Sequence, residues 1–255
     1  MKKVTTGVSG LDEMLNGGLP FGRSILVCGG PGSGKTIFGL QFLLNGINEE
    51  NENGLFVSLD ESIEHIREDA AGFGWDLEKL ENEQRLTIVD ASPLRTIPGE
   101  AKISEIRIGK RDFNMPSLMD VIMARAMKMK VKRVVVDGIT NLIIQYPQIF
   151  EQRMAMLDLL ETVSSLGSTN ILTGENRATT ITREVSAEEF LCHGVIVFHV
   201  FREGGQLVRA VQIEKMRGMA HDQQIRPYRI TDKGIVVYNK EESMDIPTEA
   251  LTSFE

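Results

Sequence analysis

Apolar residues recur along this chain with two different periods, one typical of strands and one typical of helices. Short apolar runs rich in β-branched residues predict strands at 25–28, 55–59, 86–89, 134–136, 170–173 and 195–200. Helical spacing of apolar residues fills the gaps and predicts helices at 36–48, 62–72, 117–129 and 151–166. Because strands that alternate with helices are typical of crossover units, this pattern predicts an α/β fold whose mostly parallel sheet is flanked by helices.

The pattern changes near residue 195. From there the apolar segments are short and closely spaced, and Gly-Gly or polar turns separate them, at 195–201, 207–215, 228–230 and 235–238. Such spacing is typical of hairpins, so we expect antiparallel strands that extend the sheet toward the C-terminus. Since no linker or internal repeat interrupts the pattern, residues 1–240 are expected to form one domain.

Two stretches have no clear period. Residues 92–115 combine two prolines with several charges and are expected to form either a hairpin or a mobile excursion. Residues 241–255 are acidic and weakly apolar, which predicts a disordered tail.

Composition narrows the class of protein. The net charge of -8 argues against a protein that works mainly by coating nucleic acid, because that affinity comes from Lys and Arg. A short basic strip, Lys128, Lys130, Lys132 and Arg133, is interpreted as a solvated helix end and loop. The chain has two cysteines, its first residues lack the apolar core typical of a signal peptide, and no apolar run is long enough to cross a bilayer. These features predict a cytoplasmic protein with no membrane contact.

The strongest chemical signal is the segment 29–36, GGPGSGKT, which fits the pattern G-x-x-x-x-G-K-[ST] between a predicted strand and a predicted helix. Glycines let the backbone turn tightly and point its N–H groups at a phosphate chain, and the helix dipole favours the same negative charge. Lys35 is expected to reach the β- and γ-phosphates, and the Thr36 hydroxyl to bind Mg²⁺. The predicted site for a nucleoside triphosphate comprises Gly30, Pro31, Gly32, Ser33, Gly34, Lys35, Thr36 and Ile37.

Acidic residues follow two of the predicted strands. Asp137 ends the strand at 134–136 and is expected to hold Mg²⁺ together with Thr36. Asp60 and Glu61 follow the strand at 55–59, at the edge where parallel sheets bind ligands, and one of them is expected to position or activate water. An equally supported interpretation is a helix start, with Ser62 as the N-cap and the acids stabilised by the helix dipole.

Several separated segments resemble KaiC-type domains of the RecA superfamily, in the same order. They are 6–15, 17–20, 60–62, 72–77, 89–93, 215–218, 221–222 and 230–234, so the resemblance runs from about residue 4 to 238. It implies a RecA-like ATPase core that binds ATP and Mg²⁺ and commonly assembles into a six-membered ring with ATP at each subunit junction.

The resemblance also assigns roles to individual residues. Asp60 and Glu61 match a pair of catalytic glutamates, and the shorter Asp in the first position implies slow turnover. Lys215, Met216 and Arg217 match an element inserted into the neighbour's site, where Lys215 and Arg217 would neutralise the γ-phosphate as an arginine finger does. The pattern alone would favour a solvent-facing edge strand with ordinary charges. Further matches near the nucleotide are Gly72, His221, Thr231 and Asp232.

Three functions remain open from the sequence. The first is an ATPase whose sites form between subunits of a homo-oligomeric ring, with hydrolysis coupled to conformational or partner switching. The second is a nucleotide-gated scaffold or signalling protein with little catalysis, which Asp60 favours. The third is a DNA-processing RecA-like module, which the net charge disfavours.

Two smaller features bear on these functions. Residues 188–192 lack the Ser-Thr pair of a clock-type phosphorylation site, so no autokinase activity is expected. Thr173 and Glu175 follow a predicted strand, and they are either sensors of the γ-phosphate or an ordinary strand end.

Overall fold

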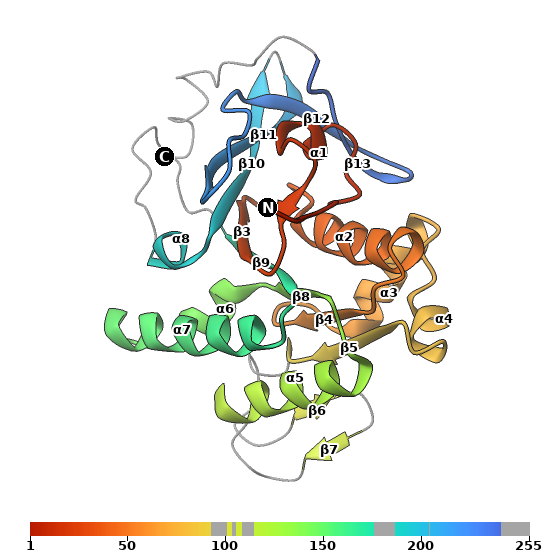
Figure 1. Cartoon of the computed structure of the whole chain (residues 1–255), viewed down its shortest axis with the longest axis vertical. Coiled ribbons are helices and arrows are strands. Elements are labelled where there is room, and N and C mark those ends of the chain that lie inside the picture. The colour runs from red at the N-terminus through yellow and green to blue at the C-terminus, as the bar shows by residue number, and fades with distance from the viewer. Residues whose placement is uncertain (93–100, 104–105, 109–114, 176–186, 204, 241–255) are drawn as a thin grey trace.

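A nine-stranded sheet forms the centre of the molecule (Figure 1). The computed structural model describes residues 1–92, 101–103, 106–108, 115–175, 187–203 and 205–240. In sheet order the parallel strands are β10 (Gly194–Glu203), β3 (Ser24–Gly29), β9 (Thr169–Glu175), β8 (Arg133–Asp137), β4 (Gly54–Ser58) and β5 (Leu86–Asp90). Beyond β10 the sheet continues through the antiparallel strands β11 (Gln206–Met216), β12 (Arg226–Thr231) and β13 (Gly234–Val237). The predicted α/β fold with an antiparallel extension is confirmed.

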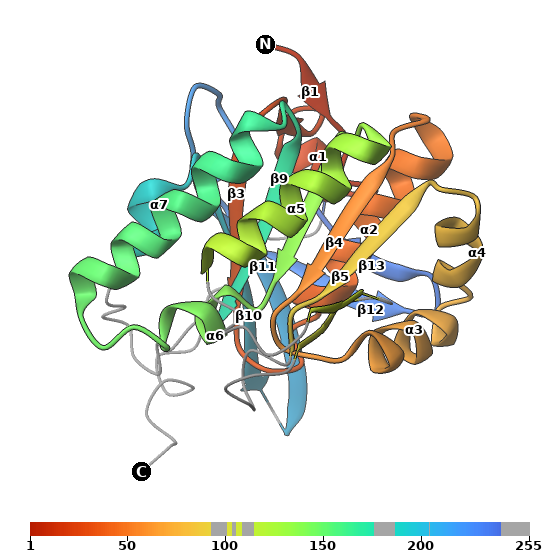
Figure 2. The same cartoon turned by 90° about the horizontal axis from the view of Figure 1, so that it is seen from below.

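Helices cover both faces of the sheet. One face is covered by α2 (Lys35–Glu49) and α3 (Ile63–Gly72), and the other by α5 (Met115–Met129) and α7 (Ile149–Ser165). Figure 2 shows α5 and α7 side by side across their face of the sheet. All four predicted helices are present, with ends displaced by one or two residues.

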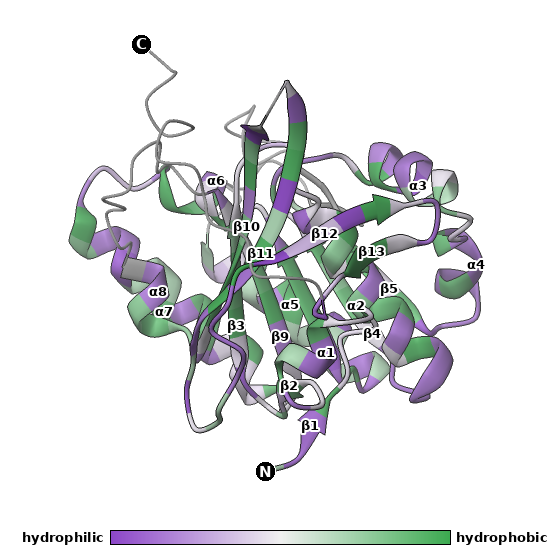
Figure 3. Cartoon of the chain, turned by 90° about the horizontal axis from the view of Figure 1, so that it is seen from above, coloured by the Kyte–Doolittle hydropathy of each residue, from purple (hydrophilic) through white to green (hydrophobic). Residues whose placement is uncertain are grey.

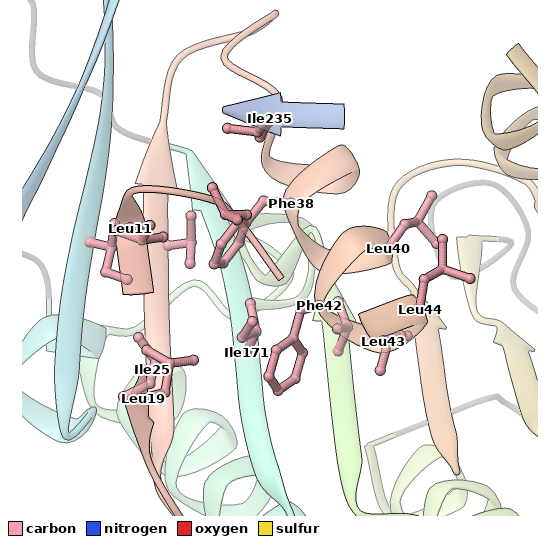
Figure 4. Close-up of a cluster of buried hydrophobic side chains, with 14 of the residues drawn as sticks. Leu11, Leu19, Ile25, Phe38, Leu40, Phe42, Leu43, Leu44, Ile171 and Ile235 are labelled. Atoms are coloured by element: carbon pink, nitrogen blue, oxygen red, sulfur yellow. The ribbon is translucent and has the colours of Figure 1, made fainter. Parts of the chain in front are cut away.

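The central residues of the parallel strands are mostly apolar because both faces of the sheet are covered there. In β4, Phe56 packs in the core beneath α2, whereas Leu55 and Val57 pack in the core beneath α5 and α7. This alternation follows from the two-residue period of a strand. Figure 3 shows the resulting apolar sheet. Figure 4 shows the core beneath α2, in which Phe38 and Phe42 of α2 lie against Ile171 of β9.

The remaining elements are short, and apolar periodicity did not predict them. They are β1 (Lys3–Val4), α1 (Leu11–Met14), β2 (Leu19–Pro20), α4 (Leu77–Asn82), α6 (Ile139–Ile143), α8 (Ala187–Leu191), β6 (Ala101–Ile103) and β7 (Ile106–Ile108). β6 pairs antiparallel with β7, which is the hairpin alternative for this stretch. The expected tail at 241–255 lies outside the described residues. Within the described ranges, every helix is too short or too polar to cross a bilayer.

Arg133 corrects one interpretation of the sequence. Its side chain is 1% exposed, so it is not part of a solvated basic strip. Its Nε donates a hydrogen bond to Glu52 at 2.7 Å, and its guanidinium donates to the carbonyl oxygens of Thr5 at 2.8 Å and Phe42 at 2.9 Å. The interpretation was wrong because Arg133 begins β8 and turns into the core, where these partners compensate the buried charge.

Gly46 of α2 provides a test of this packing. A Cβ atom at Gly46 would overlap the Nε and Cδ atoms of Arg133, whereas a Cβ at Gly72 in α3 would meet nothing within 4 Å. We expect Gly46→Ala to lower the free energy of unfolding by about 1–3 kcal/mol through overpacking. Gly72→Ala, the matched helical control, should be neutral or should stabilise by up to about 1 kcal/mol. Chemical denaturation measures both, and equal effects would contradict the role assigned to Arg133.

Candidate active site

The segment between β3 and α2 has the backbone that a phosphate-binding loop requires. Gly32 and Gly34 have φ angles of +70° and +87°, which only glycine adopts without strain. A Cβ at Gly29 would lie 2.6 Å from the Ser33 hydroxyl oxygen, so this position also needs glycine. The helix α2 begins at Lys35, directly after the loop, so its unpaired N-terminal N–H groups and its dipole favour an anion here.

The side chain of Lys35 lies within this loop. Its Nζ donates hydrogen bonds to the carbonyl oxygens of Gly29 at 2.9 Å and Gly30 at 3.1 Å. Burial lowers the pKa of Lys35, and the negative charges of Asp137 and Glu175 partly oppose that change. The ammonium group is therefore held at the place where the sequence pattern predicts a phosphate chain.

Asp137 lies at the end of β8 and joins three elements. Its Oδ2 accepts a hydrogen bond from the Thr36 hydroxyl at 2.9 Å, and its Oδ1 accepts one from the Thr173 hydroxyl at 2.5 Å. The Thr173 hydroxyl in turn accepts the Gly138 N–H at 2.9 Å. Burial raises the pKa of Asp137, while the hydrogen bonds from Thr173 and Thr36 and the charge of Lys35 lower it. The three elements meet because β9 lies between β3 and β8 in the sheet.

The oxygen atoms of Thr36 and Asp137 fit a Mg²⁺ ion. Mg²⁺ prefers hard oxygen ligands and takes only one or two carboxylates from the protein, keeping water and phosphate oxygens for the rest. The hydroxyl and the carboxylate lie within 2.9 Å of each other beside the loop. The pair predicted from the sequence is thus brought together, and it would hold the ion.

The acid pair follows β4, the neighbour of β8. The missing side chain of Gly138 leaves room for Asp60, since a Cβ there would lie 2.8 Å from the Asp60 Cβ. Ser58 fixes the turn: its hydroxyl donates to the Glu61 carbonyl oxygen at 2.6 Å and accepts the Glu61 N–H at 3.3 Å. Ser62 is the N-cap of α3, so this segment both starts a helix and lines a cavity.

The environment of Glu61 suits a proton acceptor. Burial raises the pKa of its carboxyl group above the ordinary value, and the negative charges of Asp137, Asp69 and Asp60 raise it further. A carboxylate with a raised pKa is a stronger base for the proton of an attacking water.

These residues surround a cavity of about 460 Å³, a size ordinary for small-molecule sites. The predicted residues that line it are Pro31, Gly32, Gly34, Lys35, Thr36, Ile37, Asp60, Glu61 and Asp137. Thr173 and Glu175, which the sequence left as alternatives, also line it. The residues that were missed are Asp69, Gly138, Thr140, Asn141, Gly174 and Ile230. The missed residues after β8 and in β9 carried a signal, namely their place at the carboxyl edge of predicted strands, and Ile230 opens the family-like segment 230–234.

The residues Lys215, Met216 and Arg217 lie elsewhere. Met216 pairs with Gly194, and Gly194 pairs with Ile25, so the end of β11 lies at the sheet edge opposite the phosphate loop. Met216 is buried, whereas Lys215 and Arg217 both donate hydrogen bonds to carbonyl oxygens at the end of α8 and beyond it. None of the three lines the cavity of its own chain.

The other predicted residues lie around the cavity or away from it. Thr231 and Asp232 follow Ile230, which lines the cavity, and the Thr231 hydroxyl donates to the Gly234 carbonyl oxygen at 2.9 Å across the turn. Gly72 ends the helix that carries Asp69. His221 lies in the segment after β11, where its ring contacts the Asp222 carbonyl oxygen. The nucleotide contacts of these residues, like those of Gly30 and Ser33, stay predictions.

The fold and the site together define a phosphate-loop nucleotide-binding protein of the RecA type. A family model described as "ATPase: KaiC" matches residues 4–242, and the chain belongs to this family. Family membership places the chain among RecA-type ATPase domains and supports ATP as the nucleotide.

Known proteins resemble the chain over nearly its whole length. It is 36% identical over 238 residues to the circadian clock oscillator protein KaiC of Synechococcus elongatus. This alignment covers 92% of this chain and 44% of that relative. It is 36% identical over 236 residues to the UPF0273 protein of Aeropyrum pernix, covering 92% of this chain and 93% of that protein. The crystal structure of a KaiC-like protein from Pyrococcus horikoshii matches with a TM-score of 0.79 and 33% identity, covering 93% and 99% of the two chains. The chain thus spans less than half of the clock protein.

Thr173 provides a test of the predicted metal site. Thr173→Val removes the hydroxyl that donates to Asp137, and Thr173→Ser keeps it. Because partners that orient a metal ligand are worth about 10- to 100-fold in metal affinity, we expect the Val variant to need roughly tenfold more Mg²⁺ for tight ATP binding. The Ser variant should stay near the parent protein. Nucleotide-binding titrations at stepped Mg²⁺ concentrations measure this, and equal losses in the two variants would contradict the assignment.

Proposed function

We propose that this protein is a Mg²⁺-dependent ATPase whose active sites are completed between subunits of a ring, with hydrolysis coupled to conformational or partner switching. The proposal is supported chiefly by the positions of the predicted site residues, which lie at opposite ends of the parallel strands. The phosphate loop, Asp137 and the acid pair line one cavity, whereas Lys215 and Arg217 lie at the opposite edge. Cations at that edge reach a γ-phosphate only if they belong to another copy of the chain.

Within one subunit, each residue has a separate task. The loop N–H groups and Lys35 bind the phosphate chain, and Thr36 and Asp137 hold Mg²⁺, which neutralises charge on the β- and γ-phosphate oxygens when bound. Glu61 orients a water molecule for in-line attack on the γ-phosphorus and accepts its proton, as ADP and inorganic phosphate form. The negative charge of Asp60, which packs against Gly138, raises the pKa of Glu61 and so strengthens Glu61 as a proton acceptor.

The neighbouring subunit supplies the cations. In the single chain, Lys215 Nζ donates to the carbonyl oxygens of Glu189 at 2.6 Å and Cys192 at 2.7 Å, and Arg217 donates to that of Phe190 at 3.0 Å. These acceptors are neutral, and a phosphate oxygen is a stronger acceptor for a cation. At a subunit junction, exchange of carbonyl for phosphate oxygens is therefore favourable and would make the junction sensitive to the γ-phosphate.

A second candidate is a nucleotide-gated scaffold with little catalysis. It is supported by Asp60, which stands where the family pattern has the longer Glu. The scaffold would use the same cavity and the same ring, so measured turnover separates the two candidates. A DNA-processing module is less well supported, because the net charge is -8 and Arg133 of the basic strip is buried.

Two inactive variants mixed together provide the sharpest test. The Arg217→Ala variant should bind ATP but not hydrolyse it. Its own cavity is intact, but it supplies no Arg217 guanidinium to the site of the neighbouring subunit. Glu61→Gln should also lose hydrolysis but still offers Arg217 to a neighbour. In an equal mixture, about a quarter of the junctions would pair a working cavity with a working finger, so turnover should reappear.

The controls are simple. Lys79→Ala, a change of an exposed cation on α4, should leave turnover unchanged. The proposal of shared sites fails if Arg217→Ala hydrolyses ATP at the parent rate. It also fails if the mixture stays as inactive as its components although gel filtration shows that they assemble together.

A further inference from the structure

The antiparallel extension of the sheet contacts the phosphate loop, and the function proposed above gives this contact no role. The hydroxyl of Tyr228 in β12 donates a hydrogen bond to the Ser33 carbonyl oxygen at 2.6 Å. The Tyr228 side chain is buried, and its ring lies 5.0 Å from that of Phe198. From β11, Arg209 Nε donates to the Gly32 carbonyl oxygen at 3.2 Å. The strands β11 and β12, which lie far from the loop in the sequence, thus hold two successive peptide units of the loop.

Peptide geometry gives this contact a consequence. A trans peptide unit is planar, so its C=O and N–H bonds point in opposite directions. A donor that holds the carbonyl of Ser33 on one side therefore directs the N–H of Gly34 to the other side. The donor on the Gly32 carbonyl holds the preceding peptide unit, whose Ser33 N–H donates within the loop to the Gly30 carbonyl oxygen at 3.3 Å. The Gly34 N–H is thus directed as a phosphate loop requires for binding its anion, and the Gly32–Ser33 unit closes the turn before it.

The loop needs such restraints because of its glycines. Gly32 and Gly34 flank the Ser33 unit, and glycine rotates more freely than any other residue. A Cβ at Gly34 would lie 3.0 Å from the Ile230 side chain of β12, so the same strand also encloses this turn. The carbonyls of Gly29 and Gly30 are held by Lys35. Lys35 therefore holds the two peptide units before Pro31, whereas the carbonyls of Gly32 and Ser33 are held by Arg209 and Tyr228.

We propose that Tyr228 and Arg209 are positioning residues that set the affinity of the loop for the phosphate chain by orienting the Gly32–Ser33 and Ser33–Gly34 peptide units. The proposal rests on the proposed function only in taking the loop as the nucleotide site. Burial raises the pKa of Tyr228 well above the ordinary value, so its hydroxyl stays protonated and remains a donor. In this arrangement, the antiparallel extension takes part in phosphate binding without touching the phosphate.

The test is Tyr228→Phe, which removes the donor and keeps the ring against Phe198. A single hydrogen bond of this kind is worth about a two- to tenfold change in binding, so we expect ADP and inorganic pyrophosphate to bind about two- to tenfold more weakly. Adenosine, which has no phosphate, should bind as before. Arg209→Ala should show the same selectivity, and Tyr238→Phe is the matched control outside the loop contact.

Isothermal titration with these three ligands gives the result directly. Unchanged pyrophosphate binding in Tyr228→Phe would overturn the proposal. Equal losses for adenosine and pyrophosphate would also overturn it, because they indicate general loosening of the fold, and thermal denaturation without ligand checks for that. A selective phosphate loss in a protein that hydrolyses no ATP would support this inference while the proposed function fails.

Discussion

The buried carboxylate of Asp137 is the group on which the arrangement of the site depends. A buried charge is costly unless hydrogen bonds and opposite charges compensate it. Thr36, Thr173 and Lys35 supply that compensation, and they come from the start of α2 and the end of β9. The sheet order β3-β9-β8-β4 makes this possible, because it brings four carboxyl ends together. The loop, the predicted metal ligands and the acid pair all lie at this one junction of strands.

The same sheet also separates the phosphate loop from the cations Lys215 and Arg217. β11 runs antiparallel to β10, so one strand carries Arg209 near the phosphate loop and Lys215 toward the opposite edge. If rings form as proposed, each copy of β11 would lie between its own nucleotide and that of its neighbour. A change at one nucleotide would then have a short physical route to the next site, through a strand that is hydrogen-bonded along its length.

Strong, long patterns in the sequence predicted most of the fold. The six parallel strands are mostly apolar on both faces, so each appears in the sequence as a continuous apolar run. The glycine loop and Asp137 could be placed because they stand at the ends of such runs. Arg133 was misinterpreted because neighbouring lysines suggest a surface strip, and only the fold shows that the first residue of β8 turns inward.

Other parts of the site carried no such signal. Asp69 lies on a helix, and nothing in its local sequence indicates that the fold brings it to this cavity. The contact between Tyr228 and Ser33 joins residues far apart in the chain, so only the three-dimensional structure reveals it. Short elements such as α1 and α6 have too few residues to show a period.

The central claim is that neighbouring subunits complete each active site. The most direct measurement is Mg²⁺-dependent ATP hydrolysis per subunit over a wide range of protein concentration, with bound ATP measured in parallel. The account predicts a per-subunit rate near zero in dilute protein that rises to a plateau as subunits associate. A rate that is substantial and independent of concentration, down to concentrations at which light scattering finds only single chains, would contradict it.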